Sequence, residues 1–394
     1  MANQTSPIYA VIDIGTNSTR LLLARFEEGR VQVVEKRLIA TRIGERMSRD
    51  GALTEEGMER TIKALESYVG IARGVEAEEI YVFATSAVRE ATNRDELLTR
   101  CRQRFWISID VIDGNTEALI SYLGAAPMQG ECRVLDLGGG STEMCTGRDG
   151  ELILMGSIPM GAVRAKEQFT PDEKGLKQLY RSVAKQRLEV QQKEQGEMKV
   201  QQVVARDFLA RSKKSKAPLY GVGGTITTLC ALSDGLSVRY DPRTVHGRTM
   251  TRGEVELVLR EFQQMSEEKR KSIPLLEGRE DILQYGATIL MACMDGMSAT
   301  SLIVSDSDNL EGYLVHQMKR KTAQKKNENP SPTTEGDSAE GDAQPAAPPI
   351  SVEGHKDASL HTDTFVVVPH SNRLQSVRDA SIPDPLVNTD GRCT

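Results

Sequence analysis

Cysteine and histidine are few and scattered in this 394-residue sequence. The six cysteines include no Cys-x-x-Cys pair, and the five histidines form no cluster with the spacing of metal ligands. We therefore expect reduced, mostly buried thiols rather than disulfides, and we do not expect a zinc or dinuclear iron hydrolase. A Gly-x-Ser-x-Gly motif is also absent, so the serine nucleophile of an α/β-hydrolase is not expected.

Long apolar runs are missing as well, because no stretch of about 18 apolar residues occurs. Residues 1–7 lack the basic and apolar regions of a secretory signal. These absences predict a cytoplasmic protein with no membrane partner. Aromatic residues make up only 4% of the chain, which predicts that part of it is not globular. The length still allows two domains with sizeable cores.

An excess of basic charge is also missing, since 50 Lys and Arg residues stand against 56 Asp and Glu residues. General nucleic-acid binding requires a basic face, so no nucleic-acid partner is expected. A polyanionic substrate must instead be held by local arginines and backbone N–H groups.

The most informative stretch that is present is Asp136–Thr142, which follows an apolar run. Three consecutive glycines can turn successive N–H groups toward one point, and two hydroxyl residues follow them. Such a loop suits phosphate oxygens on the N–H groups and a Mg²⁺ ion beside the Asp136 carboxylate. A glycine-rich turn between two strands needs no ligand, so one copy alone leaves both interpretations open. The candidate phosphate-binding residues are Gly138, Gly139, Gly140, Ser141 and Thr142.

A second loop of the same form begins at Asp13, directly after the apolar strand Ile8–Ile12. Asp, Gly, Ser and Thr recur in the same order and at the same offsets. The duplication favours the interpretation of the loops as two phosphate-binding hairpins that face each other, rather than as two structural turns. This loop adds the candidates Gly15, Thr16, Asn17 and Ser18.

Repeated element patterns surround the two loops. The first predicts the order βββαβαβα, with tight connections that favour antiparallel hairpins among its first three strands. The pattern restarts at Val134 and indicates an α/β fold with mixed sheets. We predict an N-terminal domain at residues 1–125 and a C-terminal domain at residues 126–320. A proline-rich, low-complexity tail at residues 321–394 is expected to be disordered.

Other elements rest on shorter patterns. We predict a strand at Ile107–Ile112, helices at Pro171–Glu189 and Met198–Ala210, and an exposed loop at Gln191–Gly196. In the tail, Phe365–Val368 is either a chance apolar cluster or a weak peptide motif.

A third glycine-rich turn, Gly223-Gly224-Thr225, joins a predicted strand to a predicted helix. It resembles half of a P-loop but lacks the lysine that follows the last glycine of that motif, which excludes P-loop chemistry. Two interpretations remain, namely phosphate binding and close packing of the helix on the strand.

Glu117 opens a predicted helix at the end of the first unit, near where the sheet edges converge. A carboxylate near a helix N-terminus is often only a partner of the helix dipole. The functional interpretation is a general base that activates water for attack on phosphorus. Arg89 follows a strand end, where it is either a structural arginine or a bidentate phosphate ligand.

With these features the sequence resembles the exopolyphosphatase and guanosine pentaphosphate phosphohydrolase family over about residues 8–318. The matching stretches are DIGTNSTRLLL (13–23), ATSAVREATN (84–93), IDGNTEAL (112–119), VLDLGGGSTEM (134–144), GSIPMGAVR (156–164), YGVGGTITTL (220–229) and VSDSDNLEGYL (304–314). The resemblance implies an actin-like fold of the sugar kinase and actin superfamily. It also implies two related domains with a cleft between them.

The resemblance assigns roles to individual residues. It implies that Glu117 is the catalytic, water-activating residue, that Asp136 is associated with Mg²⁺, and that Glu143 belongs to the same metal-side motif. The phosphate-contacting positions that it implies are Asn17, Ser18, Arg20, Arg89 and Gly138 to Ser141. The sequence departs from the family pattern at Asp113 and Thr116. Because the predicted tail does not have the pattern of the helical C-terminal domain of longer members, we expect the short, two-domain form.

The implied function is that of an exopolyphosphatase that releases terminal phosphate from inorganic polyphosphate with Mg²⁺ as cofactor. Conversion of guanosine pentaphosphate to the tetraphosphate by the same groups is the alternative. An ATP-dependent kinase and an actin-like filament protein are further interpretations of the same fold. The expected partners are one of these two substrates and a second copy of the chain in a homodimer.

Overall fold

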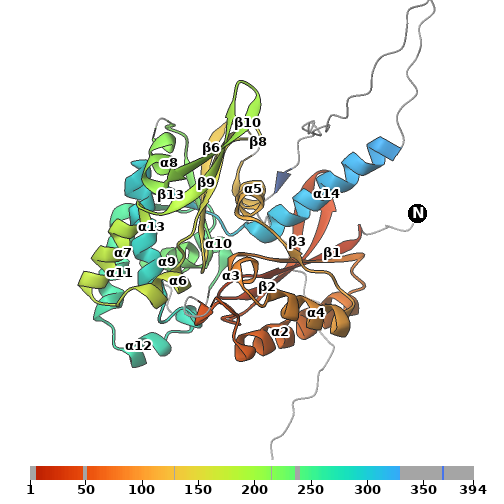
Figure 1. Ribbon diagram of the computed structural model, residues 1–394, viewed down its shortest axis with the longest axis horizontal. Helices are drawn as coiled ribbons and strands as arrows, with labels where there is room; N and C mark the ends of the chain where they lie inside the picture. The colour runs from red at the N-terminus through yellow and green to blue at the C-terminus, as the bar shows by residue number, and fades with distance from the viewer. Residues whose placement is uncertain are drawn as a thin grey trace, which may run out of the picture.

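The computed structural model describes residues 6–47, 51–127, 129–213, 215–235, 240–328 and 366–367. These residues form two α/β halves that lie side by side, each built on its own sheet (Figure 1). Among the described helices, none combines the length and the apolar character that crossing a membrane requires.

The first sheet is built around β1, an apolar strand whose residues from Tyr9 onward are buried. β1 pairs antiparallel with β2 and parallel with β4. Its order is β14-β3-β2-β1-β4-β5. The strands are β1 (Ile8–Ile14), β2 (Thr19–Glu27), β3 (Arg30–Ile39), β4 (Glu79–Ala84), β5 (Asp110–Val111) and β14 (Val366–Val367), of which β14 pairs with β3.

The second sheet repeats this arrangement around β6 and extends it at both edges. Its order is β10-β9-β8-β7-β6-β11-β13-β12. The strands are β6 (Glu131–Leu137), β7 (Thr142–Arg148), β8 (Glu151–Ile158), β9 (Arg187–Glu194), β10 (Glu197–Val204), β11 (Leu219–Val222), β12 (Thr249–Thr251) and β13 (Ser301–Val304).

The central five strands have the same order and direction in both sheets. β3-β2-β1-β4-β5 corresponds to β8-β7-β6-β11-β13, with two antiparallel pairs followed by two parallel pairs. The duplicated α/β fold of the actin-like type, predicted from the sequence, is therefore confirmed. The predicted domain boundaries themselves stay predictions.

The helices cover both faces of each sheet. In α2, the N-cap residue Thr54 accepts the Gly57 N–H at 3.1 Å, which satisfies one of the free N–H groups of the first turn. The helices of the first half are α2 (Glu55–Gly74), α3 (Ser86–Glu90), α4 (Arg94–Phe105) and α5 (Gly114–Ala125). Those that follow are α6 (Ala162–Gln168), α7 (Glu173–Val183), α8 (Ala205–Ser212), α9 (Gly224–Ser233), α10 (Pro242–Val245), α11 (Arg252–Gln264), α12 (Glu267–Lys271), η1 (Pro274–Leu276), α13 (Leu283–Met297) and α14 (Asn309–Glu328).

Two helices join the halves. Ala118 and Tyr122 of α5 are buried against residues of the second sheet, whereas Leu310 and Leu314 of α14 are buried against the first sheet. α5 and α14 approach each other closely, because a Cβ on Gly312 would collide with the backbone of α5. α5 follows the strands of the first half in the sequence but packs on the second sheet, whereas α14 follows the strands of the second half but packs on the first sheet.

Four secondary-structure predictions are wrong in part. Met198–Ala210 is a strand, β10, followed by the short helix α8, because β9 and β10 form a hairpin. The predicted loop Gln191–Gly196 lies mostly in β9, and the helix predicted for Pro171–Glu189 ends at Val183. The strand predicted for Ile107–Ile112 shrinks to β5.

The last described helix reaches into the segment that is predicted as a tail. α14 continues to Glu328, beyond residue 321, and Lys321 Nζ pairs with Glu79 Oε1 at 2.5 Å. This contact anchors the end of the helix on the first half. The rest of the predicted tail lies outside the described residues, except for β14.

Candidate active site

Both Asp-x-Gly-x-x-Ser-Thr segments form the turn between the first two strands of a sheet. In the first loop, residues 13–19, the Gly15 N–H donates to the Ser18 carbonyl at 3.1 Å. In the second loop, residues 136–142, the Gly138 N–H donates to the Ser141 carbonyl at 3.1 Å. The duplicated sequence therefore folds into the same turn twice.

Contacts with α6 fix the direction of the peptide groups in the second loop. The carbonyl groups of its first two glycines accept N–H groups from the N-terminal end of α6 at 2.8–3.1 Å. The Gly140 carbonyl accepts a hydrogen bond from Nε of Arg164 at 2.8 Å. Because the C=O and N–H of a trans peptide point in opposite directions, the N–H groups of Gly139, Gly140 and Ser141 point away from α6. Within the described part of the chain these three N–H groups have no backbone acceptor.

The first loop is held in the same way by the segment that follows β3. The Thr16 carbonyl accepts the Gly44 N–H at 2.9 Å, and the Asn17 carbonyl accepts the Arg42 N–H at 2.8 Å. The N–H groups of Asn17 and Ser18 are thereby turned away from this segment. Successive N–H groups that converge in this manner form a site for anions such as phosphate.

A cavity of about 790 Å³ separates the halves and is lined by both loops. The loops touch at its base, because a Cβ on Gly140 would lie 2.4 Å from Ser86 Oγ and 2.8 Å from Thr16 Oγ1. The prediction that the two loops face each other therefore agrees with the geometry.

The third glycine turn joins β11 to α9 and lines the same cavity through Gly223, Gly224 and Thr225. Gly223 has a φ of +102°, and a Cβ there would lie 2.5 Å from the Leu137 carbonyl, so only glycine fits. A Cβ on Gly224 would lie 2.4 Å from the Arg279 guanidinium, which places this cation at the N-terminus of α9. Sequence reasoning missed Arg279, because an isolated arginine in a polar loop carries no distinguishing pattern.

Glu117 lies in the first turn of α5 and reaches the cavity. Its Oε2 accepts a hydrogen bond from Nη1 of Arg89 at 2.9 Å, and the same nitrogen donates to the Ile112 carbonyl at 3.0 Å. Burial raises the pKa of Glu117 to about 7, while the Arg89 charge acts in the opposite direction. Arg89 is not among the residues that line the cavity. Its direct contact with phosphate stays a prediction.

Asp136 reaches the cavity from the end of β6. Its Oδ2 accepts a hydrogen bond from Oγ of Ser121 at 2.8 Å, and this Oγ lies 2.6 Å from Oδ1 of Asn309. Burial raises the pKa of Asp136 to about 6, although the Ser121 hydrogen bond opposes the shift. α5 therefore carries both Glu117 and the side chain that orients Asp136.

Two predicted site residues lie behind the wall of the cavity. The Thr142 hydroxyl donates to the Met160 carbonyl at 2.6 Å. Oε1 of Glu143 accepts a hydrogen bond from Ser157 Oγ at 2.6 Å. Burial raises the pKa of Glu143 well above its ordinary value, and the charge of Glu117 adds to this. Phosphate binding by Thr142 and metal binding by Glu143 remain predictions.

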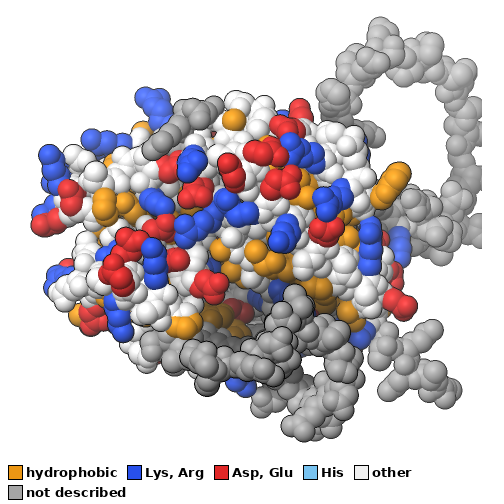
Figure 2. All heavy atoms as spheres, turned by 90° about the horizontal axis from the view of Figure 1, so that it is seen from below, with side chains coloured by type: hydrophobic (Ala, Val, Ile, Leu, Met, Phe, Trp, Pro, Cys, Tyr) orange, Lys and Arg blue, Asp and Glu red, His pale blue; other side chains and the backbone are white. Residues whose placement is uncertain are grey.

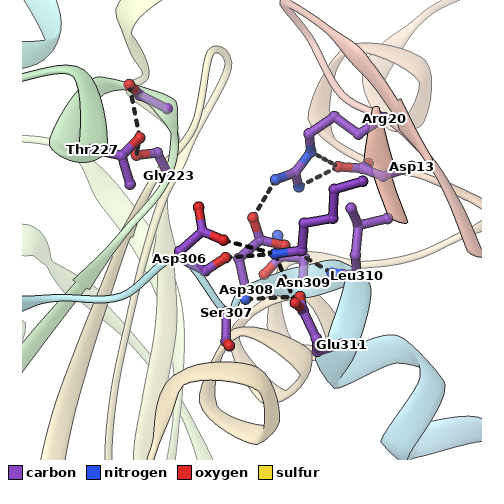
Figure 3. Close-up of polar contacts among 12 residues, drawn as sticks. Asp13, Arg20, Gly223, Thr227, Asp306, Ser307, Asp308, Asn309, Leu310 and Glu311 are labelled. Atoms are coloured by element: carbon purple, nitrogen blue, oxygen red, sulfur yellow. Dashed lines mark hydrogen bonds and ion pairs between the residues drawn. The ribbon is translucent and has the colours of Figure 1, made fainter. Parts of the chain in front are cut away.

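Arg20 is held by carboxylates from both halves (Figure 3). Its Nε and Nη2 donate to Oδ2 of Asp13 at 3.0 and 2.5 Å, and its Nη1 donates to Oδ2 of Asp308 at 2.5 Å. Burial acts to raise the pKa of Asp308, but the charges of Arg20 and Lys36 outweigh it and lower that pKa. No role is predicted for Asp308 from the sequence, although it lies in the matching stretch 304–314.

The profile of the Ppx/GppA phosphatase family matches residues 22–321, which is more than half of the sequence. The chain belongs to the Ppx/GppA phosphatase family. Ppx/GppA proteins are phosphatases that hydrolyse phosphoanhydride bonds. The family suggested by the sequence motifs is therefore confirmed.

Three curated Ppx/GppA relatives show how far the similarity extends. A bifunctional 3-dehydroquinate synthase/phosphatase of Fusobacterium nucleatum is 31% identical over 325 residues, covering 79% of this chain and 47% of that protein. A candidate exopolyphosphatase of Haemophilus influenzae is 33% identical, covering 41% of this chain and 51% of that protein. A guanosine-5'-triphosphate,3'-diphosphate pyrophosphatase of Vibrio vulnificus is 35% identical, covering 42% of this chain and 34% of that protein. The chain spans about half or less of the length of these relatives.

A solved Ppx/GppA structure extends the comparison to the fold. The family member from Aquifex aeolicus is 29% identical and superimposes with a TM-score of 0.61. The similarity covers 80% of this chain and 98% of that chain.

Ppx/GppA phosphatases generally depend on a divalent metal ion. Among the described residues, no three His, Cys, Asp or Glu side chains have the arrangement of a closed metal site. Mg²⁺ often needs only one or two carboxylates, because water and substrate phosphates complete its coordination. Asp136 and Asp13 line the cavity, and among the described residues the buried Oδ1 of Asp13 has no hydrogen-bond partner. These oxygen donors fit a Mg²⁺ ion that is shared with the substrate.

Proposed function

We propose that this Ppx/GppA protein hydrolyses the terminal phosphoanhydride bond of inorganic polyphosphate. One observation carries the proposal: the two loops turn unpaired N–H groups toward a single cavity that also contains the buried carboxylate of Glu117. The N–H groups suit a phosphoryl group, and the carboxylate suits an attacking water. The exopolyphosphatase among the relatives supports this choice.

In the proposed reaction, the two loops hold the terminal phosphoryl group. Ionised Glu117 accepts a proton from a water molecule, whose oxygen bonds to phosphorus as the bridging P–O bond breaks. The products are inorganic phosphate and a polyphosphate anion that is shorter by one unit, and Glu117 then releases its proton to solvent. Phosphoryl transfer depends mostly on positioning and electrostatics, so a small set of residues suffices.

The environment of Glu117 suits a general base. Such a base works best when its pKa lies near the operating pH, and the pKa of Glu117 is about 7. Burial alone favours the protonated form of Glu117, whereas the charge of Arg89 stabilises the ionised carboxylate at neutral pH. We therefore assign Arg89 a role at Glu117 in addition to its predicted contact with phosphate.

A bound Mg²⁺ ion would neutralise negative charge on the phosphate oxygens. Asp136 is the residue that we expect to hold it, with Asp13 lining the same cavity, and metal binding by Glu143 stays a prediction. Ser121 and Asn309 orient the Asp136 carboxylate for this task.

The cavity also favours a substrate with several anionic groups. Arg279 lines the cavity beside the third glycine turn and forms no ion pair with a described carboxylate. Figure 2 shows Lys and Arg side chains mixed with Asp and Glu over the visible face. We therefore expect individual cations that line the cavity, rather than a broad basic surface, to attract an anionic substrate. Guanosine pentaphosphate also offers several phosphates, and it is the second candidate because a pyrophosphatase of a guanosine nucleotide is among the relatives.

Phosphate release by the purified 394-residue chain tests the proposal. The substrates are tripolyphosphate, long-chain polyphosphate, guanosine pentaphosphate and, as a control, the monoester p-nitrophenyl phosphate, each with Mg²⁺ or with EDTA. We expect Mg²⁺-dependent release from polyphosphates, faster than from guanosine pentaphosphate, and little release from the monoester. Faster release from guanosine pentaphosphate would establish the second candidate, and release from the monoester alone would contradict both.

A further inference from the structure

The two phosphate loops are supported differently at one equivalent position. In the first loop the Asn17 carbonyl is held by a backbone N–H, that of Arg42. The equivalent residue in the second loop is Gly140, whose carbonyl is held by the side chain of Arg164 at 2.8 Å. A backbone donor is fixed by the fold, whereas a side-chain donor depends on what else holds it in place.

Arg164 is held in place by the opposite half of the protein. It belongs to α6 of the second half, and its Nη2 donates to Oε2 of Glu90 at 2.6 Å and to Oγ of Ser86 at 3.2 Å. Both partners are on α3 of the first half, where the Ser86 hydroxyl also donates to Oε1 of Glu90 at 2.9 Å. One guanidinium group therefore joins the second loop to the first half of the molecule.

We propose that Arg164 is a positioning residue that links contact between the two halves to the orientation of the Gly140–Ser141 peptide. The guanidinium can bond the Gly140 carbonyl and the α3 pair together only while α3 and α6 keep their present separation. If the halves move apart, Arg164 loses Glu90 and Ser86, and the Gly140 carbonyl loses its fixed donor. The Ser141 N–H would then no longer be held toward the cavity.

Two observations place this role outside direct substrate contact. Arg164 and Glu90 are not among the residues that line the cavity, whereas Ser86 and the loop glycines are. Glu90 also neutralises the charge of Arg164, so the pair adds little net attraction for an anion. A planar guanidinium suits the task because it donates in several fixed directions at once, which a lysine does not.

The contact between the halves is tight at this point. A Cβ on Gly140 would collide with Ser86 Oγ, so the loop backbone lies directly against α3. Glycine at this position therefore allows the close approach that brings Arg164 within reach of both partners.

The test rests on the proposed function and uses tripolyphosphate as the probe. Arg164→Met should raise the dissociation constant for tripolyphosphate, measured by calorimetry, and lower kcat/KM by about 10–100-fold, the range seen when a supporting partner of a site is removed. Glu90→Gln should produce a smaller change in the same direction. The acid limb of the pH–rate profile, which reports Glu117, should not move in either variant.

A double-mutant cycle identifies the linkage. Since Glu90 acts through Arg164, the double variant Arg164→Met/Glu90→Gln should be no worse than Arg164→Met alone. Arg148→Met is the matched control, because Arg148 of β7 forms an exposed ion pair with Glu131 of β6 in the second sheet. Circular dichroism checks that each variant is folded, and Arg164→Lys replaces Arg164→Met if the latter does not fold.

Additive effects in the cycle, or an Arg164→Met protein that binds tripolyphosphate like the Arg148→Met control, would overturn the proposal. Failure of the proposed function would look different. In that case the wild-type protein would release no phosphate, while the binding measurements would still compare the variants.

Discussion

The ion pair between Arg89 and Glu117 gives the sharpest prediction. In the Arg89→Met variant, the Glu117 carboxylate stays buried but loses the cation that lies 2.9 Å from it. Two unit charges about 4 Å apart interact by about 4 kcal/mol at the effective dielectric of a partly exposed site. Because Arg89 is one-fifth exposed, solvent screens part of this energy. We therefore expect the pKa of Glu117 to rise by about 1–3 units above its present value.

The direction of the effect on activity follows from the role of Glu117 as a base. Only the ionised form accepts a proton from water, so activity falls as the pH drops through the pKa. With a pKa of about 7, half of the wild-type protein is active at pH 7. A rise of one to three units lowers kcat/KM at pH 7 by about 5- to 500-fold, and activity recovers at alkaline pH.

The assay is a pH profile of kcat/KM for tripolyphosphate from pH 5 to 10. Arg89→Lys keeps a positive charge and should shift the acid limb less, and Arg94→Met is a control because Arg94 contacts the Arg89 carbonyl but not Glu117. A loss of activity of equal size at every pH would refute the reasoning. It would show that Arg89 acts through phosphate alone.

Three further predictions concern stability, each measured by urea unfolding. The pKa of Glu117 in the folded protein exceeds its ordinary value of 4.5, so its contribution to stability is present below that value and is lost as the pH rises through 7. Glu117→Gln should therefore raise the free energy of unfolding at pH 8 by roughly 3 kcal/mol, and by far less at pH 5. Gly223→Ala should cost about 1–3 kcal/mol because of its positive φ, whereas Gly253→Ala in α11, where the added Cβ would meet only Thr251 Oγ1 at 3.9 Å, should not destabilise the protein. Lys36→Met leaves the fully buried Glu311 without its cationic partner at 2.6 Å and should lower the free energy of unfolding by about 3–5 kcal/mol. The double variant Lys36→Met/Glu311→Gln should lose less stability. Equal losses in the two variants would contradict a role of the ion pair.

The duplicated architecture could be predicted because its signals are local. Each loop follows a buried strand, and the same residue types recur at the same offsets, so two similar hairpins are the simplest explanation. The structure adds the peptide directions, which the sequence does not reveal because they depend on donors such as Arg164 and Arg42. Those donors are distant from the loops in the sequence.

The errors have a tertiary cause. The segment Met198–Ala210 contains apolar residues at helical spacing, but its first part pairs with β9 in a hairpin and becomes β10. Ladder hydrogen bonds to a neighbouring strand decided the outcome, and local propensity does not report them. α14 extends past residue 321 for a similar reason, since Lys321 contacts Glu79 of the first half.

The site could be predicted only where a motif marks it. Glu117 and Asp136 lie at the cavity as expected, whereas Arg279 reaches it from a loop whose place in the fold is not apparent from local patterns. The predicted homodimer and the cytoplasmic location stay predictions.

The central claim is that Glu117 activates the attacking water between the two phosphate loops. Its most direct test is single-turnover phosphate release from tripolyphosphate by Glu117→Ala, with binding of the same probe measured in parallel. We predict a rate lower by about 10²–10⁴, the usual contribution of a general base, with binding retained. Turnover close to that of the wild-type protein would contradict the account.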